Sequence, residues 1–273
     1  MVELIKEPFV TRAITCGLLI SILLSGLGLF LVLRRLSLIG DGLAHVSFGG
    51  ISLGILLERS PFYIAIPICV FASVGILKVR KVAKMYPDAA IGIVSSLGIA
   101  SGAILSSLKG GFNVEILSYL FGSILSVTTE DMVLSLIFMV IFLAYTFLFY
   151  NDLVSSAFDE ELAYAEGVDV EKINTVLSVF TAITIVLGIK VVGLLLVTSL
   201  LILPPVTALQ FSTNFRATFL LSVLFGMTSV VVGIFISVVL DVPPGSSIVI
   251  TNFGIFLIVL SLQGKKLLTK GKK

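Results

Sequence analysis

Charged residues are scarce in this chain of 273 residues: Asp, Glu, Lys and Arg together make up only 12% of it. Hydrophobic residues make up 58%, and the mean hydropathy is +1.19. A soluble domain carries roughly 25% charged residues, so the composition excludes an ordinary soluble protein. It predicts an all-α fold, a polytopic bundle of transmembrane helices. The net charge of +2 identifies no partner, because the distribution of charges matters more than their sum.

Motifs for nucleotide binding and metal-dependent hydrolysis are also absent. The chain has no GxxxxGK[ST] phosphate loop, so it does not bind ATP by that device. It has no HExxH motif either. Its two cysteines, Cys16 and Cys69, lie in apolar runs without a CxxC spacing, and we interpret them as buried thiols. We therefore expect a protein that is not an enzyme and has no permanently bound cofactor.

Charged residues divide the sequence into apolar segments long enough to cross a membrane. We predict spanning helices near 13–33, 37–57, 61–78, 89–107, 132–150, 173–189, 191–210, 217–240 and 246–263. The stretch 114–127 is shorter and polar at its edges, which favours a surface or re-entrant helix. The predicted count is therefore eight or nine spans, or ten if 114–127 crosses.

Basic clusters predict the orientation in the cell (inner or plasma) membrane. One cluster lies in residues 78–84 and the other in the C-terminal tail, 264–273. By the positive-inside rule both are cytoplasmic. Counting back from the tail places 151–172 inside, and it places 108–131, 241–246 and the N-terminus outside.

The only histidine, His45, lies four residues after Asp41 in an apolar run. Residues four apart share one face of a helix, so a carboxylate and an imidazole are presented to one point. With Arg34 and Arg35 at the membrane surface, a rise of ~1.5 Å per residue places Asp41 ~9 Å deep and His45 ~15 Å deep. Ionisable groups at such depth usually face a bundle interior or a transport pathway.

Glycine and proline predict two interrupted helices. The Asp41–His45 pair is flanked by Gly40, Gly42, Gly49 and Gly50. We interpret these glycines as the mark of a broken or unwound helix, which binding sites at membrane depth often use. Pro204-Pro205 lies within the apolar run 194–209. Because proline removes a helix hydrogen bond and clashes with the preceding turn, we predict an interruption there that leaves carbonyls near 199–201 unpaired.

The longest charged stretch, 151–172, is acidic although it is placed inside, where connections prefer basic residues. A solvated linker is one interpretation. The other is a short cytoplasmic helix followed by a glycine turn, which offers a rigid surface to a soluble partner. On this second interpretation 156–170 is helical and lies outside the bilayer. The candidate docking residues are Asp159, Glu160, Glu161, Ala163, Glu166 and Gly167.

Several short stretches, taken together, point to a known family. They are 38–45 (LIGDGLAH), 88–94 (DAAIGIV), 120–125 (LFGSIL), 159–167, 192–199 (VGLLLVTS), 203–205 (LPP) and 241–245 (DVPPG). In this order they resemble the permease subunit of the zinc/manganese/iron class of ABC importers. Each stretch is weak alone, but the ordered set is specific and covers residues 10–263.

The resemblance implies a single transmembrane domain, residues 1–273, that forms a homodimer over two cytoplasmic ATPase subunits. An extracytoplasmic metal-binding protein would supply zinc, manganese or iron as the transported substrate. The family's metal-path motif is carried over to Asp41 and His45, and its ATPase-docking segment to 159–167. Many relatives have a proline shortly after that histidine, where this chain has Phe48-Gly49-Gly50. The departure puts the local geometry in question rather than the role.

The candidates for lining or gating the pathway are Ser199, Pro204, Pro205 and Asp241. Asp241 lies in a Pro- and Gly-rich turn that is placed outside, where it could contact a molecule that arrives from that side.

A carboxylate with an imidazole suits divalent ions of the first transition row, and two or three protein ligands allow release after binding. Two ligands from each of two subunits could complete a four-ligand site.

The sequence leaves alternatives open. His45 could be a packing residue bonded to Asp41 or to a carbonyl. The chain could be an ion-coupled secondary transporter that uses Asp41, or an ABC permease for metal chelates with a wide pathway. The sequence does not show whether zinc, manganese or iron is transported, because Asp and His bind all three.

Overall fold

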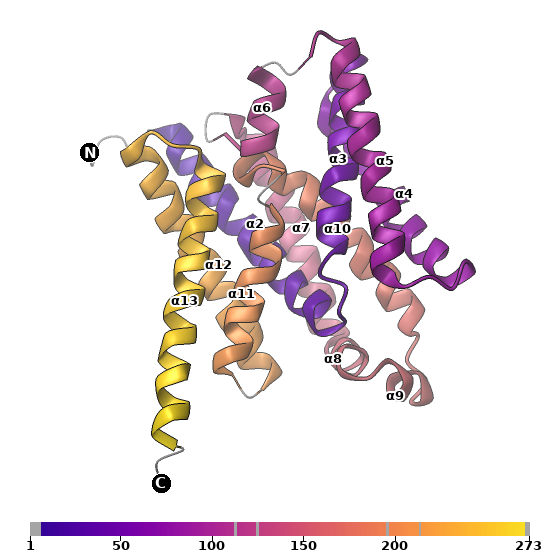
Figure 1. Ribbon diagram of the computed structural model, residues 1–273, viewed down its shortest axis with the longest axis vertical. Coiled ribbons are helices and arrows are strands. Elements are labelled where there is room, and N and C mark those ends of the chain that lie inside the picture. Colours follow the sequence, from indigo (N-terminus) through magenta and orange to yellow (C-terminus); the bar gives the residue numbers. More distant parts are fainter. Residues whose placement is uncertain (1–6, 112–113, 124–125, 195–196, 213, 271–273) are drawn as a thin grey trace.

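The computed structural model describes residues 7–111, 114–123, 126–194, 197–212 and 214–270, without the side chains of 114–115 and 264–270. Within these ranges the regular structure is helical and contains no β-strand, which confirms the predicted all-α class. The helices form one bundle, with the short helices α8 and α9 at one end and α6 at the other (Figure 1). Side chains of the predicted basic tail, 264–273, lie outside the described residues.

Eight described helices are long and apolar enough to cross a membrane. They are α2 (Pro8–Leu33), α3 (Ile39–Leu56), α4 (Pro61–Val82), α5 (Pro87–Leu108), α7 (Thr129–Leu148), α10 (Val170–Val192), α12 (Phe215–Leu240) and α13 (Pro244–Lys270). A shorter apolar helix, α11, covers Val197–Phe211. Each predicted span overlaps one of these nine helices. The prediction of a multi-pass protein with eight or nine spans is therefore confirmed.

Helix ends follow local sequence signals. Proline occupies the first turn of α2, α4 and α5, where its missing N–H has no helical partner in any case. Thr128 and Asp131 form a reciprocal capping box at the start of α7. The connections after α2, α3, α4 and α12 each contain a non-glycine residue with positive φ: Arg35, Glu58, Lys84 and Asp241. These left-handed residues reverse the chain in short connections.

The core of the bundle is made by three helices, α2, α3 and α10. More than two thirds of the residues in their apolar windows are buried, against a third or fewer in α4, α5, α7, α12 and α13. Figure 1 shows α2 crossing the bundle at a slant to α13. In α2, Leu23, Leu24 and Leu27 are fully buried among the neighbouring helices. The outer helices present apolar side chains outward, as helices in contact with lipid must.

The stretch 114–127 does not form a tenth span. Its helix, α6 (Val114–Phe121), has only eight residues, which corresponds to about 12 Å of length. The helix ends at Phe121, and the next residue, Gly122, has φ 78° and turns the chain toward the end of α10. There Ser123 N–H donates to the Lys190 carbonyl at 2.9 Å, and Leu194 N–H donates to the Tyr119 carbonyl at 2.9 Å. These bonds connect the short helix to the bundle.

The glycines around Asp41 do not interrupt their helix, so this interpretation was wrong. Helix α3 runs without a break from Ile39 to Leu56. The glycines permit close packing instead: a Cβ at Gly42 would lie 2.7 Å from a methyl carbon of Ile91, and one at Gly50 would lie 2.8 Å from the Cα of Ala65. Small residues let neighbouring helices approach to this distance.

The predicted interruption at the proline pair was also wrong. Helix α11 continues through Pro204 and Pro205 to Phe211, and the chain breaks earlier, at Gly193 with φ 88°. Two prolines in succession remove only the N–H groups that would bond the carbonyls of residues 200 and 201. Just beyond them, the Thr207 hydroxyl donates to the Leu203 carbonyl at 2.7 Å, and the helix continues.

One of the carbonyls that the prolines leave free lies against α2 at Gly28. A Cβ at Gly28 would lie only 1.8 Å from the carbonyl oxygen of Leu201. We therefore predict that Gly28→Ala destabilises the fold by about 3 kcal/mol or more, because a backbone oxygen cannot move aside as a side chain can. Thermal unfolding of the purified chain in detergent measures this.

The control for this prediction is Gly75→Ala in α4, where a Cβ would meet nothing within 4 Å. It should leave the melting temperature unchanged or raise it slightly. Equal melting temperatures for Gly28→Ala and Gly75→Ala would contradict the close approach of α2 and α11.

Candidate functional site

Asp41 and His45 lie on one face of α3, one helical turn apart. The Asp41 Oδ2 atom is 3.6 Å from His45 Nε2. Two ligands at ~2.1 Å from a tetrahedral metal ion are about 3.4 Å apart, so the pair has the spacing of two ligands of one ion. Asp41 also lies in the first turn of α3, where the positive end of the helix dipole favours a carboxylate.

The two side chains differ in exposure: 53% of the Asp41 side chain is accessible, against 20% for His45. Most residues of α3 are buried, so Asp41 stands out as a charged group on the free side of a core helix. Among the described residues, no third His, Cys, Asp or Glu joins the pair. The described part of the chain therefore offers two side chains of these types at this point.

Helix α5 holds α3 in place behind His45. A Cβ at Gly98 would lie 2.7 Å from the carbonyl oxygen of His45, so the two backbones are in direct contact. A Cβ at Gly49 would lie 3.2 Å from the Gly98 carbonyl oxygen. Two opposed glycines thus bring α5 against the turn that carries the imidazole. This close packing fixes the position of His45 relative to α5.

The acidic stretch forms two short helices, α8 (Tyr150–Phe158) and α9 (Glu160–Ala165). Between them Asp159 caps α9, since its Oδ1 accepts from the N–H groups of Glu161 and Leu162, both at 3.0 Å. Gly167 has φ 88° and turns the chain toward α10. The predicted short helix followed by a glycine turn is therefore present, although a break at Asp159 divides 156–170.

The predicted docking residues of this stretch have different positions. Glu161 and Glu166 are exposed, whereas Ala163 is fully buried and anchors α9 to the bundle. Phe158 and Tyr164 lie within the predicted segment 156–170 but were not named among the candidate docking residues, and both are exposed aromatic side chains. Exposed aromatic residues among charges are typical of surfaces that bind another protein.

A groove of about 1040 Å³ separates α9 and the start of α10 from the end of α4. Its walls carry both charge signs: Lys78, Arg80, Lys81, Lys84, Glu160, Glu161 and Glu171. Lys81 and Glu171 are joined by a salt bridge of 2.6 Å. The basic connection and the acidic stretch, which the sequence analysis placed on the same side of the membrane, thus lie next to each other.

The remaining candidates lie in different places. Pro204 and Pro205 are buried within α11, and Ser199 lies one turn before them, half-buried. The same helix approaches the start of α3, since a Cβ at Gly40 would lie 2.5 Å from a methyl carbon of Leu201. Asp241 caps α12 in the left-handed conformation and is exposed. It lies at the α12–α13 turn, far along the bundle from α9 (Figure 1).

The chain contains one short pattern that is typical of hydrolases, but its serine does not have the geometry of a nucleophile. Residues 50–54 (GISLG) fit the GxSxG pattern of a hydrolase nucleophile elbow. That elbow exposes its serine on a sharp turn between a strand and a helix. Here Ser52 lies inside α3, is only 1% exposed, and its Oγ is 3.0 Å from the Oγ of Ser106. The serine is therefore a packing residue between α3 and α5.

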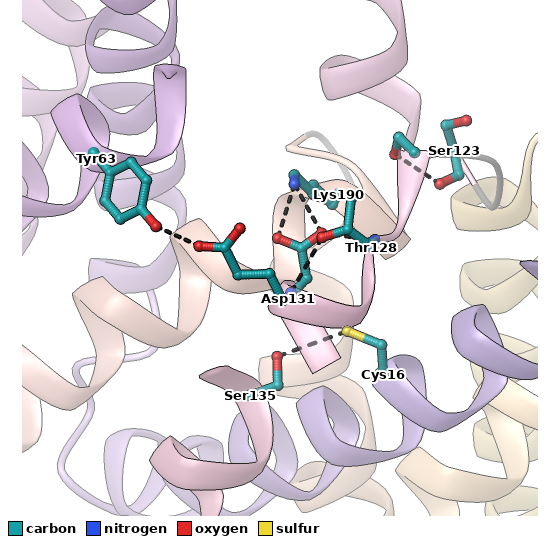
Figure 2. Close-up of polar contacts among 9 residues, drawn as sticks. Cys16, Tyr63, Ser123, Thr128, Asp131, Ser135 and Lys190 are labelled. Atoms are coloured by element: carbon teal, nitrogen blue, oxygen red, sulfur yellow. Dashed lines mark hydrogen bonds and ion pairs between the residues drawn. The ribbon is translucent and has the colours of Figure 1, made fainter. Parts of the chain in front are cut away.

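A buried ion pair, Asp131–Lys190, was missed by the sequence analysis. The Lys190 ammonium donates to both carboxylate oxygens of Asp131, at 2.8 Å each, and Figure 2 draws both bonds as dashed lines. The two side chains are 12% and 15% exposed. The same carboxylate accepts the Thr128 N–H and hydroxyl of the capping box at 2.8 and 2.6 Å, and the ammonium lies 4.4 Å from the centre of the Phe62 ring. The pair thus joins α4, α7 and α10.

The comparisons with known proteins agree with one another. The family model described as the ABC 3 transport family matches residues 6–263. The zinc uptake membrane protein ZnuB of Haemophilus influenzae is 30% identical over 92% of this chain and 95% of its own length. The manganese transport membrane protein MntC of Halalkalibacterium halodurans is 29% identical over 97% of this chain and 90% of its own. The solved structure of PsaBC from Streptococcus pneumoniae is 31% identical, with a TM-score of 0.85 over 94% of this chain and 93% of that one.

Proposed function

Because the chain belongs to the ABC 3 transport family, we propose that it is the permease subunit of an ATP-driven importer of divalent transition metal ions. The observation that carries the proposal is the Asp41–His45 pair, whose oxygen and nitrogen atoms lie 3.6 Å apart on a core helix of the bundle. The permease forms the pathway, and separate ATPase subunits hydrolyse ATP. The named relatives are zinc and manganese transporters, which supports zinc, manganese or iron as the substrate.

Two ligands from one chain suit transport better than storage. A closed four-ligand site holds a metal ion permanently, whereas a site with open positions exchanges its ligands. In the proposed homodimer, the same pair on a second chain supplies the other two ligands. The half-exposed carboxylate of Asp41 supports this arrangement, because a carboxylate turned toward lipid would be costly. Protons compete with the ion for both ligands, so binding should weaken as pH falls.

The α8–α9 segment is the proposed docking surface for the ATPase. It carries exposed charged and aromatic side chains at the same end of the bundle as the basic residues of α4. The opposite end would receive the metal from an extracytoplasmic binding protein. Metal would then pass along α3 between the two subunits of the homodimer.

Reconstitution in proteoliposomes tests the proposed function. The chain is combined with an ABC ATPase and a metal-binding protein from the same organism, and uptake of zinc, manganese and iron is measured. We expect uptake of at least one metal that requires hydrolysable ATP and persists when proton and sodium gradients are collapsed. Uptake driven by an ion gradient without the ATPase would contradict the proposal and support a secondary transporter.

Cysteine crosslinking tests the docking surface. Glu161→Cys and Glu166→Cys place thiols on exposed positions, and both should crosslink to single cysteines on the ATPase. The native Cys16 and Cys69 are buried and should give little background. Ala163→Cys is the matched control, since that position is fully buried. Labelling of positions 161 and 166 by an impermeant reagent from the extracytoplasmic side would contradict a cytoplasmic docking surface.

A further inference from the structure

Arg34, at the end of α2, connects three parts of the structure that are distant in sequence. Its guanidinium donates hydrogen bonds to Asn174 Oδ1 in α10 and to Ser156 Oγ in α8. The Asn174 amide in turn donates to Glu160 Oε1 in α9 at 3.4 Å. One side chain therefore joins the α2–α3 connection to the α8–α9 segment and to the start of α10.

Electrostatics favour the hydrogen bonds of Arg34 to Asn174 and Ser156. Burial lowers the pKa of the Arg34 guanidinium, and the carboxylate of Glu160 raises it in part. Arginine remains protonated in proteins, so a partly buried guanidinium requires fixed acceptors. Its planar fork can bond two acceptors at once, which the single ammonium of lysine does not reproduce. Asn174 and Ser156 are those two acceptors.

The connection between Arg34 and Asp41 is short and hydrogen-bonded along its length. Leu36 N–H donates to the Leu31 carbonyl at 2.8 Å, and Ile39 N–H donates to the Leu36 carbonyl at 3.0 Å. Helix α3 then begins, and Asp41 lies in its first turn. These bonds leave little slack between Arg34 and the helix that carries Asp41 and His45.

We propose that Arg34 is a positioning residue that transmits movement of the α8–α9 segment to α3, and so couples the ATPase to the metal ligands. The inference rests on the proposed function, in which α8–α9 docks the ATPase. Arg34 belongs neither to the proposed ligand pair nor to the proposed docking segment α8–α9, so its loss should separate ATP hydrolysis from transport. A residue that only stabilised the fold would lower both activities together.

The test compares Arg34→Lys with Arg35→Lys in the reconstituted complex. Both changes keep the charge, but Arg35 is exposed. The readout is zinc or manganese imported per ATP hydrolysed, whichever metal the wild type imports. We expect the ratio to fall at least about fivefold in Arg34→Lys, the lower limit of typical coupling between sites, with ATPase binding retained. Arg35→Lys should keep the wild-type ratio, and an unchanged ratio in Arg34→Lys would overturn the inference.

If the Arg34→Lys complex does not assemble, Asn174→Ala and Ser156→Ala test the inference instead. Each removes one acceptor and keeps the arginine, so each should lower the ratio while the complex forms. Wild-type ratios in both variants would overturn the role of Arg34. In Arg34→Lys/Asn174→Ala the ratio should be no lower than in Arg34→Lys, since both changes break the same contact. A wild-type complex that imports no metal with ATP would instead refute the proposed function itself.

Discussion

Asp41→Asn and His45→Ala should each abolish metal uptake or reduce it severely, while expression, dimerisation and ATPase docking stay near wild-type levels. Asp41→Asn keeps the size and polarity of the side chain and removes its charge, and His45→Ala removes the nitrogen ligand. Loss of a second-shell partner alone costs about 10–100-fold in metal affinity, so loss of a ligand should cost at least as much. The measurement is uptake normalised to the amount of assembled complex.

A matched control separates the metal role of the pair from a packing role. Asp88→Asn makes the same chemical change in the first turn of α5, where the side chain is exposed. It should leave uptake much less affected than Asp41→Asn. If Asp41 and His45 served only to pack α3, their variants would express or assemble poorly and show near-normal uptake per complex. Wild-type uptake in both variants would end the interpretation as a metal pathway.

Asp131→Asn should destabilise the protein strongly, by about 3–5 kcal/mol, because it leaves the Lys190 ammonium buried without its counter-ion. The asparagine oxygen can still accept from Thr128, so the cap of α7 survives and the loss falls on the ion pair. Thermal unfolding of the purified chain in detergent measures the effect. Glu130→Gln is the control, since it removes the neighbouring acidic charge at an exposed position.

The double variant Asp131→Asn/Lys190→Met should recover much of this loss, since it leaves no charge of the pair behind. A buried pair replaced as a whole costs far less than a pair with one partner removed. A double variant less stable than Asp131→Asn would show that the ammonium is held by other groups. Equal melting temperatures for Asp131→Asn and Glu130→Gln would show that the pair contributes nothing to stability.

The positions of the helices could be predicted from the amino-acid sequence. Each of the nine predicted spans overlaps a helix, because a segment crossing lipid must satisfy its backbone internally and must be apolar over its length. Both requirements are local. The Asp41–His45 geometry is local as well: residues four apart on a helix are neighbours, and the side-chain atoms are 3.6 Å apart.

The predictions that failed depended on which helix lies against which. Glycines near Asp41 are compatible with an unwound helix or with a tightly packed one. The helix is tightly packed because Ala65, Ile91 and Gly98 on neighbouring helices lie against these glycines. Pro204-Pro205 fits a break or a continuous helix. Gly28 on α2 leaves room for the Leu201 carbonyl that the prolines free, so the helix continues. In both cases the same residues are compatible with a broken or a continuous helix, and the neighbouring helix determines which one forms.

The long-range polar contacts were beyond the reach of sequence patterns. Asp131 and Lys190 are 59 residues apart, and Arg34 and Asn174 are 140 apart. Apolar periodicity identifies a helix and its buried face, but it does not state which charge on another helix faces it. The amino-acid order thus accounts for the spans and the candidate ligand pair. Helix packing, which brings distant polar groups together, accounts for the buried ion pair and for the contact of Arg34, at the end of α2, with α8 and α10.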